Sequence, residues 1–237
     1  MGLYSPMLGL YSVSVNPEMT ASGQDQSVSG AELARILGSP KAAAEFKILR
    51  AARHLLASDG LGISMEAIAD KADVGRSTIF RHFPSRDELV ARALDESLSH
   101  FHGQVPGAIA ETVGLEEWLT STVAALHHLQ MTAGRGLWQL AAADDRDLPP
   151  PIARINKKRR RTRHETTLTL AGEAWRRSGA TGPVPKEVEL AFALSFSSFT
   201  AHSINNDYGA DEQDTVRMIV QLLLGLLSSR RQNRTNV

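Results

Sequence analysis

The chain has no cysteine among its 237 residues. This absence excludes disulfide bonds, thiolate metal sites and a cysteine nucleophile. A net charge is also missing, because 26 Lys and Arg residues balance 26 Asp and Glu residues. A compact nucleic-acid-binding module is often strongly basic. A basic surface for nucleic acid must therefore be confined to one part of this chain. The neutral total points to a second part of the chain with another role.

Long apolar runs are missing as well. No stretch reaches the ~20 residues that a membrane-spanning helix needs, and the N-terminus lacks the charged and then apolar segments of a signal peptide. We therefore expect a cytoplasmic protein with no membrane partner. There is no alternating strand pattern and no internal repeat, while 42% of the residues are hydrophobic. The expected fold class is all-α.

Signatures of catalysis are also absent. The chain has no glycine-rich phosphate loop, no nucleophile elbow and no recognisable pair of carboxylates. The neighbours His127 and His128 would point about 100° apart on a helix, and no carboxylate stands four residues from either. We expect no catalytic residues, no metal and no cofactor. An enzyme in the C-terminal helices is a weaker alternative, because it would need a titratable cluster in a cavity.

The most informative stretch begins at Ser64, a good N-cap residue. Apolar residues then follow at the spacing of one helical face, Met65, Ile68 and Ala72. A turn with Gly75, which has wide conformational freedom, separates this helix from a second short one predicted over residues 76–83. Two short helices joined by a tight turn form a helix-turn-helix.

The outward side chains of the second helix are all hydrogen-bond donors, namely Arg76, Ser77, Thr78, Arg81 and His82, and no acid lies between residues 74 and 86. The first turn of a recognition helix reaches base edges in the major groove, where a long cation can pair with a guanine edge. Hydroxyls and later cations suit phosphate oxygens, which set register rather than sequence.

A specific motif runs through this stretch: Ser64-x-x-x-Ile68-Ala69, then Ala72-x-Val74-Gly75-x-Ser77-Thr78-Ile79-Phe80-x-His82-Phe83-x-Ser85-Arg86-x-x-Leu89. Over roughly residues 42–98 the chain thereby resembles the DNA-binding domain of TetR-type transcriptional repressors. The resemblance implies that Arg76, Ser77 and Arg81 face bases. It also implies that Thr78, His82 and Arg86 face phosphates, and that Ser64 caps its helix and touches the DNA backbone. The family usually has Tyr where this chain has Phe80, so the phosphate contact of that phenol is in doubt.

We expect four regions along the chain. Residues 1–40 form a largely disordered arm with a short helix near 30–37, and residues 41–98 form the helix-turn-helix domain. Residues 99–231 form a helical domain for effector binding and dimerisation, and residues 232–237 a tail. Within the third region, turn-rich separators delimit helices predicted over residues 115–131, 134–143, 151–177, 186–206 and 212–231.

The last two predicted helices are apolar on more than one face, so each must be buried against two partners. One partner is the chain's own core, and the resemblance implies that the other is a second copy in a four-helix interface. The residues assigned to dimerisation are Phe192, Phe199, Val216, Ile219, Val220, Leu223 and Leu227. A second set of apolar positions contains Leu190, Leu194 and Ala201 in the first of these helices and Met218, Leu222 and Gly225 in the second. The alternative is a monomer in which both helices are well buried.

A set of aromatic and polar residues is expected to line an effector cavity among the helices, namely Trp118, Trp138, Gln139, Trp175, Phe196 and His202. Taken individually, each of them is better explained as a simple core residue than as a cavity residue. As a set they suit a flat or aliphatic hydrophobic effector better than a highly charged one. The basic run at residues 157–163 has two interpretations. We favour a solvated helix face over a contact with a polyanion or an acidic effector.

These observations predict a homodimeric, all-α, sequence-specific DNA-binding transcriptional regulator. We expect a repressor that a small hydrophobic effector releases from double-stranded operator DNA. The alternative is an effector-binding or scaffold protein whose helix-turn-helix head has lost its affinity for DNA, with Phe80 as a symptom.

Overall fold

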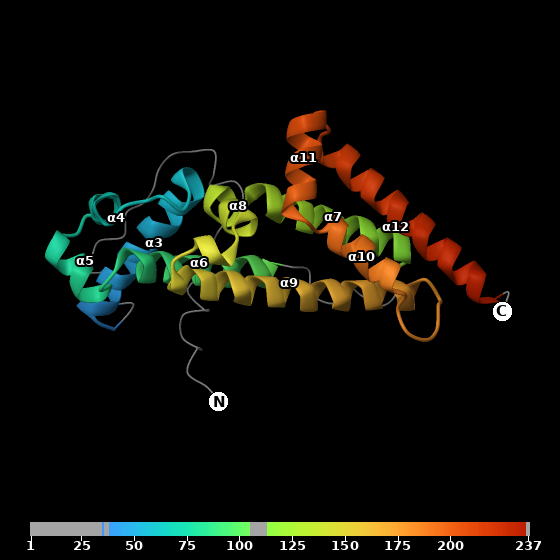
Figure 1. Ribbon diagram of the computed structural model, residues 1–237, viewed down its shortest axis with the longest axis horizontal. Coiled ribbons are helices and arrows are strands. Elements are labelled where there is room, and N and C mark those ends of the chain that lie inside the picture. Colours follow the sequence, from blue (N-terminus) through green and yellow to red (C-terminus); the bar gives the residue numbers. More distant parts are fainter. Residues whose placement is uncertain (1–34, 36–37, 105–112, 236–237) are drawn as a thin grey trace. The chain divides into compact units, whose positions relative to one another are not determined.

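The structure, a computed structural model, describes residue 35 and residues 38–104 and 113–235. The described residues form ten α-helices, α3 to α12, one short 3-10 helix and no strand, which confirms the all-α fold class (Figure 1). The predicted arm, with its helix near residues 30–37, lies almost entirely outside the described residues. The chain divides into two compact units, Met1–Ala44 and Glu45–Val237, and the first turn of α3 belongs to the smaller one.

Four helices form the N-terminal part: α3 (Pro40–Asp59), α4 (Met65–Ala72), α5 (Arg76–His82) and α6 (Arg86–Gln104). Their apolar faces meet in a first core, as the periodicity predicts. Its large buried residues include Ile48, Leu49, Leu56, Ile63, Ile68, Ile79, Phe83, Leu89 and Leu94. Leu140 and Ile152, far beyond residue 98, are buried in the same core. Helices from the C-terminal part therefore complete the core of the helix-turn-helix region.

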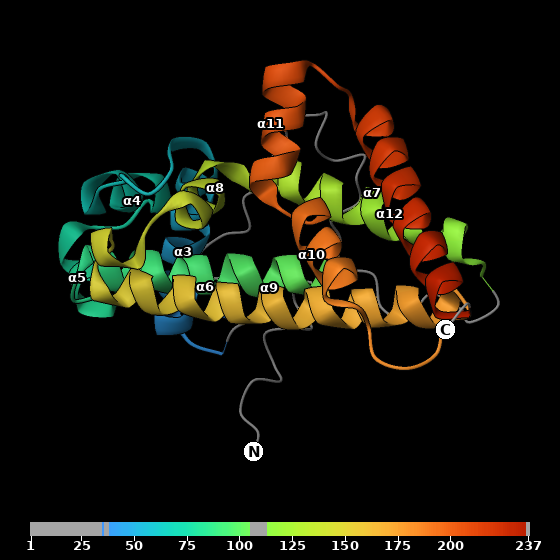
Figure 2. The ribbon, with the colours of Figure 1, turned by 45° about the vertical axis from the view of Figure 1, so that its right-hand side comes forward.

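The remaining helices are α7 (Leu115–Thr132), α8 (Gly134–Ala142), α9 (Pro150–Arg177), α10 (Lys186–Ser195), α11 (Ser198–Tyr208) and α12 (Glu212–Thr235), with the 3-10 helix η2 (Asp145–Asp147) before α9. The long helix α9 packs along α6 and contacts α10, while α7 packs against α12 (Figures 1 and 2). A second core forms among α7, α9, α10 and α12. None of the described helices combines the length and hydropathy that a membrane crossing requires.

One predicted helix is wrong. The sequence predicts a single helix over residues 186–206, but the structure has a break at Phe196 and Ser197, where Ser197 adopts extended backbone angles. Because of the break, backbone carbonyls near residue 196 lose the N–H donors that a continuous helix would provide. Arg163 of α9 supplies side-chain donors in their place. Its Nη2 donates to the carbonyl of Ala193 at 2.6 Å, and its Nε donates to the carbonyl of Phe196 at 3.4 Å. A side chain from another helix therefore stabilises the interruption, which no local pattern reveals.

Candidate functional site: a helix-turn-helix and a cavity behind it

The turn between α4 and α5 is built by a cap and a left-handed residue. The Ser64 hydroxyl accepts from the N–H of Ala67 at 3.1 Å, which confirms its predicted role as N-cap. The positive φ of the turn, 52°, belongs to Asp73, whereas Gly75 has the ordinary angles −67° and 151°. Asp tolerates the left-handed region better than most residues. The special conformation that the sequence suggests for Gly75 therefore lies two residues earlier.

Helix α5 has one buried side and one exposed side. Ile79 is fully buried and Phe83 follows it into the first core, which fixes the rotation of the helix. Arg76, Ser77 and Arg81 are exposed, and Thr78 is half-buried beside them. The buried anchor therefore leaves a row of donors facing solvent.

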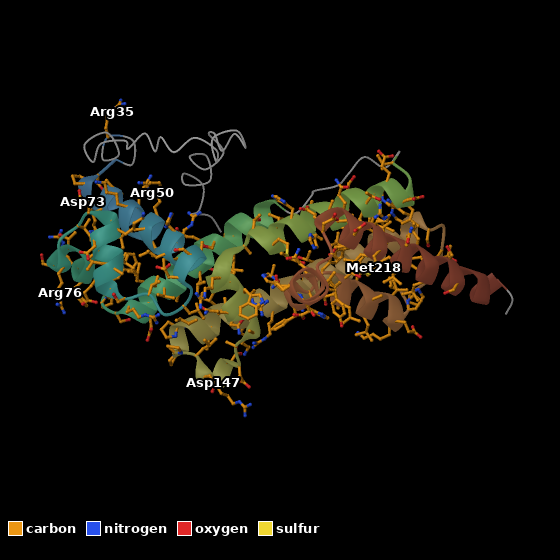
Figure 3. All side chains as sticks on the ribbon, turned by 90° about the horizontal axis from the view of Figure 1, so that it is seen from above. Arg35, Arg50, Asp73, Arg76, Asp147 and Met218 are labelled. Atoms are coloured by element: carbon orange, nitrogen blue, oxygen red, sulfur yellow. The ribbon has the colours of Figure 1, made fainter. Side chains whose placement is uncertain are left out.

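Arg76 is held by two neighbours while no DNA is bound. Its Nη2 lies 3.6 Å from Oε1 of Glu66 on α4, and its guanidinium stands 5.7 Å from the ring centre of Phe80. Figure 3 shows Arg76 pointing outward from the ribbon, on the same part of the molecule as Asp73. Phe80 is 41% exposed, a large value for an aromatic ring without a polar group. In this position Phe80 supports Arg76 through a cation–π contact, a role that the missing phenol does not affect.

Two predicted phosphate ligands have other surroundings. The Nε of Arg86 donates to the carbonyl of Ile63 at 2.9 Å, its Nη2 donates to the carbonyl of Leu61, and its Nη1 pairs with Asp87 at 2.8 Å. Arg86 thus ties the loop before α4 to the start of α6, which contradicts the expectation of a free phosphate-facing cation. His82 is half-buried, and its Nδ1 is shielded from solvent with no hydrogen-bond partner among the described residues.

A cavity of about 90 Å³ lies among α6, α7, α8, α9 and the start of α11. Its wall is mostly apolar, with polar groups concentrated on α9. The lining residues are Leu98, Leu126, Gln130, Ala133, Leu137, Trp138, Ala141, Arg159, Arg163, Thr166, Thr167, Leu170, Phe196 and Ser198.

The predicted effector residues fall into different places. Trp138 and Phe196 line the cavity. His202 does not line it but stacks near Trp138, with ring centres 5.9 Å apart. Trp118 and Trp175 are wrong as cavity residues because both are buried in the second core. The indole N–H of Trp175 donates to the carbonyl of Gly182 at 3.2 Å. The guanidinium of Arg177 lies over the ring of Trp118, 5.5 Å from the ring centre.

Gln139 is also wrong as a cavity residue, and its actual place is informative. It lies on the opposite side of α8, where its Oε1 accepts from the N–H of Leu61 at 2.7 Å. A Cβ on Gly60, whose φ is 87°, would stand 2.2 Å from that oxygen. On the same side, a Cβ on Gly136 would stand 2.7 Å from the carbonyl oxygen of Leu56. Helix α8 therefore touches the helix-turn-helix region with one side and lines the cavity with the other.

The residues assigned to dimerisation are almost all buried in their own chain. Phe192, Val216, Ile219, Val220, Leu223 and Leu227 belong to the second core. Phe199 is half exposed but contacts Trp138, with ring centres 6.3 Å apart. The six core residues cannot also contact a second copy. Of the second set, Leu190, Leu194, Met218 and Leu222 are exposed, whereas Ala201 is buried.

The main cavity residues that the sequence prediction missed are Arg159 and Arg163. Both belong to the basic run at residues 157–163, for which a solvated face was expected. The other cations of this run do face outward: Arg160 pairs with Asp145, Arg161 with Glu165 and Lys158 with Asp95. A signal was present, because positions 159 and 163 continue the spacing of Ile152, Asn156, Thr167 and Leu170, the buried stripe of the same helix.

Comparison with known proteins agrees with the fold and with the motif. Residues 48–93 match the family of bacterial regulatory proteins of the tetR type. A structure from Streptomyces avermitilis, described as a TetR transcriptional regulator, is 18% identical, covers 76% of this chain and 97% of its own, and has a TM-score of 0.51. Salmonella enterica GusR is 21% identical, with 78% and 95% covered and a TM-score of 0.52. Curated protein sequences give no match. The helix-turn-helix segment therefore matches the tetR-type family of bacterial regulatory proteins, and the chain shares its fold with these two structures.

Proposed function

We propose that the protein is a dimeric, sequence-specific repressor that leaves its operator when a small molecule occupies the cavity. The observation that carries the proposal is the surface of α5. A buried Ile79 holds the helix, and an exposed row of donors begins at its first residue, Arg76. Two such helices in one dimer would enter successive major grooves about 34–36 Å apart.

Within the row, Arg76, Ser77 and Arg81 would face base edges, and Thr78 and His82 would face phosphates. Arg86 leaves this set because its donors are engaged with Leu61, Ile63 and Asp87. Bound DNA would compete with Glu66 for Arg76. The pair is exposed and 3.6 Å apart, and exposed ion pairs of this kind contribute at most about 1 kcal/mol. The competition therefore costs little.

The dimer would form through the exposed faces of α10 and α12. On α12, Met218, Leu222 and Gly225 lie nearly opposite the buried stripe at 100° per residue. Leu222 is 65% exposed in the single chain, and Leu194 on α10 is 67% exposed. Among the described residues, no atom outside the backbone of α12 itself and the two neighbouring residues lies within 4 Å of a Cβ built on Gly225. A glycine in mid-helix costs about 1 kcal/mol relative to alanine, and close approach of a second helix would explain its presence.

Helix α8 would couple the cavity to the DNA-binding surface. Trp138 and Ala141 line the cavity, while Gly136 and Gln139 touch the end of α3 and the loop after it. A ligand that displaces α8 would move these contacts. It would favour release only through its higher affinity for the displaced state.

The DNA-binding role is tested by Arg76→Ala. We expect a loss of about 1–3 kcal/mol in binding to the operator and relaxed specificity at one base pair. The measurement is fluorescence anisotropy with DNA from upstream of the protein's own gene, over a range of salt concentrations. Arg161→Ala is the matched control, because Arg161 is an exposed arginine paired with Glu165 on α9.

Equal operator affinity of Arg76→Ala and the parent protein would refute the assigned role. If the parent protein binds no DNA even at low salt, the alternative of a head without DNA affinity gains support. The dimer is tested separately by Leu222→Glu, which should give monomers in sedimentation, whereas Gln213→Glu on the same helix should leave the dimer intact. A Leu222→Glu protein that stays dimeric would show that this face is not the interface.

A further inference from the structure

The cavity contains a cation that the protein itself leaves without a counter-ion. The Nε of Arg159 donates to Oδ1 of Asn156 at 2.9 Å, but its two terminal nitrogens have no hydrogen-bond or ion-pair partner among the described residues. Asn156 is fully buried and donates in turn to Oδ1 of Asp145 at 2.9 Å. The buried amide therefore orients the guanidinium without neutralising it.

Neighbouring groups do not supply the missing charge. The carboxylate of Asp145 is engaged by Arg160 as well as by Asn156. Arg163, the second arginine in the cavity wall, donates from its Nε to the carbonyl of Phe196 and from its Nη2 to the carbonyl of Ala193. Burial, followed by repulsion from Arg163 and Arg160, lowers the pKa of Arg159 to about 10. Arg159 thus stays cationic at neutral pH in surroundings that disfavour a cation.

The rest of the wall is apolar. Trp138 and Leu137 come from α8, Leu126 from α7, Leu170 from α9, and Phe196 from the break after α10. A volume of about 90 Å³ is several times the roughly 10–15 Å³ that a cavity needs to admit one water, so a small organic molecule has room here. A half-buried cation is costly without a partner, and a planar guanidinium binds a carboxylate through two parallel hydrogen bonds.

We propose that the cavity binds a small amphipathic monocarboxylate, with its carboxylate on the free nitrogens of Arg159 and its apolar body against Trp138 and the surrounding leucines. This inference rests on the proposed function, in which the cavity is the effector site. It changes the ligand class expected from the sequence, a flat or aliphatic hydrophobic molecule rather than a highly charged one, to an amphipathic anion with a single charge. Cationic ligands are excluded by the two arginines in the wall.

The test uses two matched pairs of probes, benzoate with benzamide and hexanoate with hexanamide, which differ in charge but hardly in shape. Binding to the full-length protein is measured by calorimetry and by the fluorescence of Trp138, which lines the cavity. We expect each carboxylate to bind at least about tenfold more tightly than its amide, as a charge-assisted hydrogen bond implies. Arg159→Met should remove this preference, and Arg161→Met, on the exposed side of α9, should keep it.

Equal binding of acid and amide, no binding of either acid, or a preserved preference in Arg159→Met would each overturn the proposal. Arg159→Lys provides a folded variant that keeps the charge, and this variant should retain part of the preference for acid over amide. Complete loss of the preference in Arg159→Lys would also count against a charge-based site. Operator release is measured in a separate titration with DNA. Carboxylates that bind but do not release DNA would support this inference and refute the proposed effector function.

Discussion

Replacing Gly136 by alanine tests whether α8 and α3 are in contact through their backbones. Gly136 lies in the first turn of α8, and a Cβ at this position would stand 2.7 Å from the carbonyl oxygen of Leu56 and 3.3 Å from its Cβ. A backbone oxygen cannot rotate away as a flexible side chain would. The substitution therefore forces α8 and α3 apart.

The magnitude follows from two opposing effects. Alanine is favoured over glycine within a helix by about 0.8–1.0 kcal/mol, whereas overpacking costs about 1–3 kcal/mol. We expect Gly136→Ala to lower the free energy of unfolding by up to about 2 kcal/mol. Gly172→Ala on α9 is the matched control, because a Cβ at this position would meet no other part of the described structure within 4 Å beyond its chain neighbours and the backbone of α9 itself. It should raise the free energy of unfolding by up to about 1 kcal/mol.

The assay is urea unfolding followed by far-UV circular dichroism, with all variants at one protein concentration because the proposed dimerisation would couple stability to concentration. The quantity of interest is the difference between the two alanine variants, expected at about 1–3 kcal/mol. If both variants gain the same stability, α8 adjusts to a Cβ at no cost. Helix α8 would then not be a rigid link between the cavity and the helix-turn-helix region.

Three further outcomes follow from the geometry. Gln139→Ala removes the acceptor of the Leu61 N–H and should cost about 1 kcal/mol in urea unfolding, whereas no loss would show that water replaces the amide. Burial lowers the pKa of His127 below its ordinary 6.5, so the unfolded chain binds more protons than the folded chain. The free energy of unfolding should therefore fall as the pH falls below about 6.5, by up to about 1.4 kcal/mol per pH unit. His127→Leu should flatten this slope in urea titrations at pH 7 and below, and an unchanged slope would assign the effect to other groups. Asp73→Gly should stabilise the protein by up to about 1 kcal/mol because it relieves a positive φ. Gly75→Ala should change thermal stability by less than about 0.5 kcal/mol, because its Cβ would stand 4.0 Å from the Ser77 hydroxyl oxygen, an ordinary van der Waals distance; a large loss would contradict this.

Local signals predicted most of the helices. The N-cap at Ser64 and the apolar spacing of Met65, Ile68 and Ala72 gave α4 with the bounds that the structure has. Caps, turns and one apolar face are encoded within a few neighbouring residues, so a reading of the sequence can recover them. The break at residue 196 is different, because it depends on donors from Arg163, which lies 33 residues earlier in the chain.

The site was harder to predict for a related reason. Helix α12 is apolar on two sides, and nothing local distinguishes the side with Leu223, which faces the chain's own core, from the side with Leu222, which is exposed. The basic run posed the same problem, because only its rotation about the axis of α9 separates Arg159 from Arg160. Such choices depend on which helices pack around a given one, and that information is spread over the whole chain.

The break between α10 and α11 would link the two proposed events, ligand uptake and subunit association. Arg163 holds the last carbonyls of α10 and also forms part of the cavity wall. An anion that drew its guanidinium away would leave those carbonyls without donors and loosen the end of the helix that carries Leu194. Ligand uptake and subunit association would then be thermodynamically coupled, so that diluting the protein would alter its apparent affinity for the small molecule.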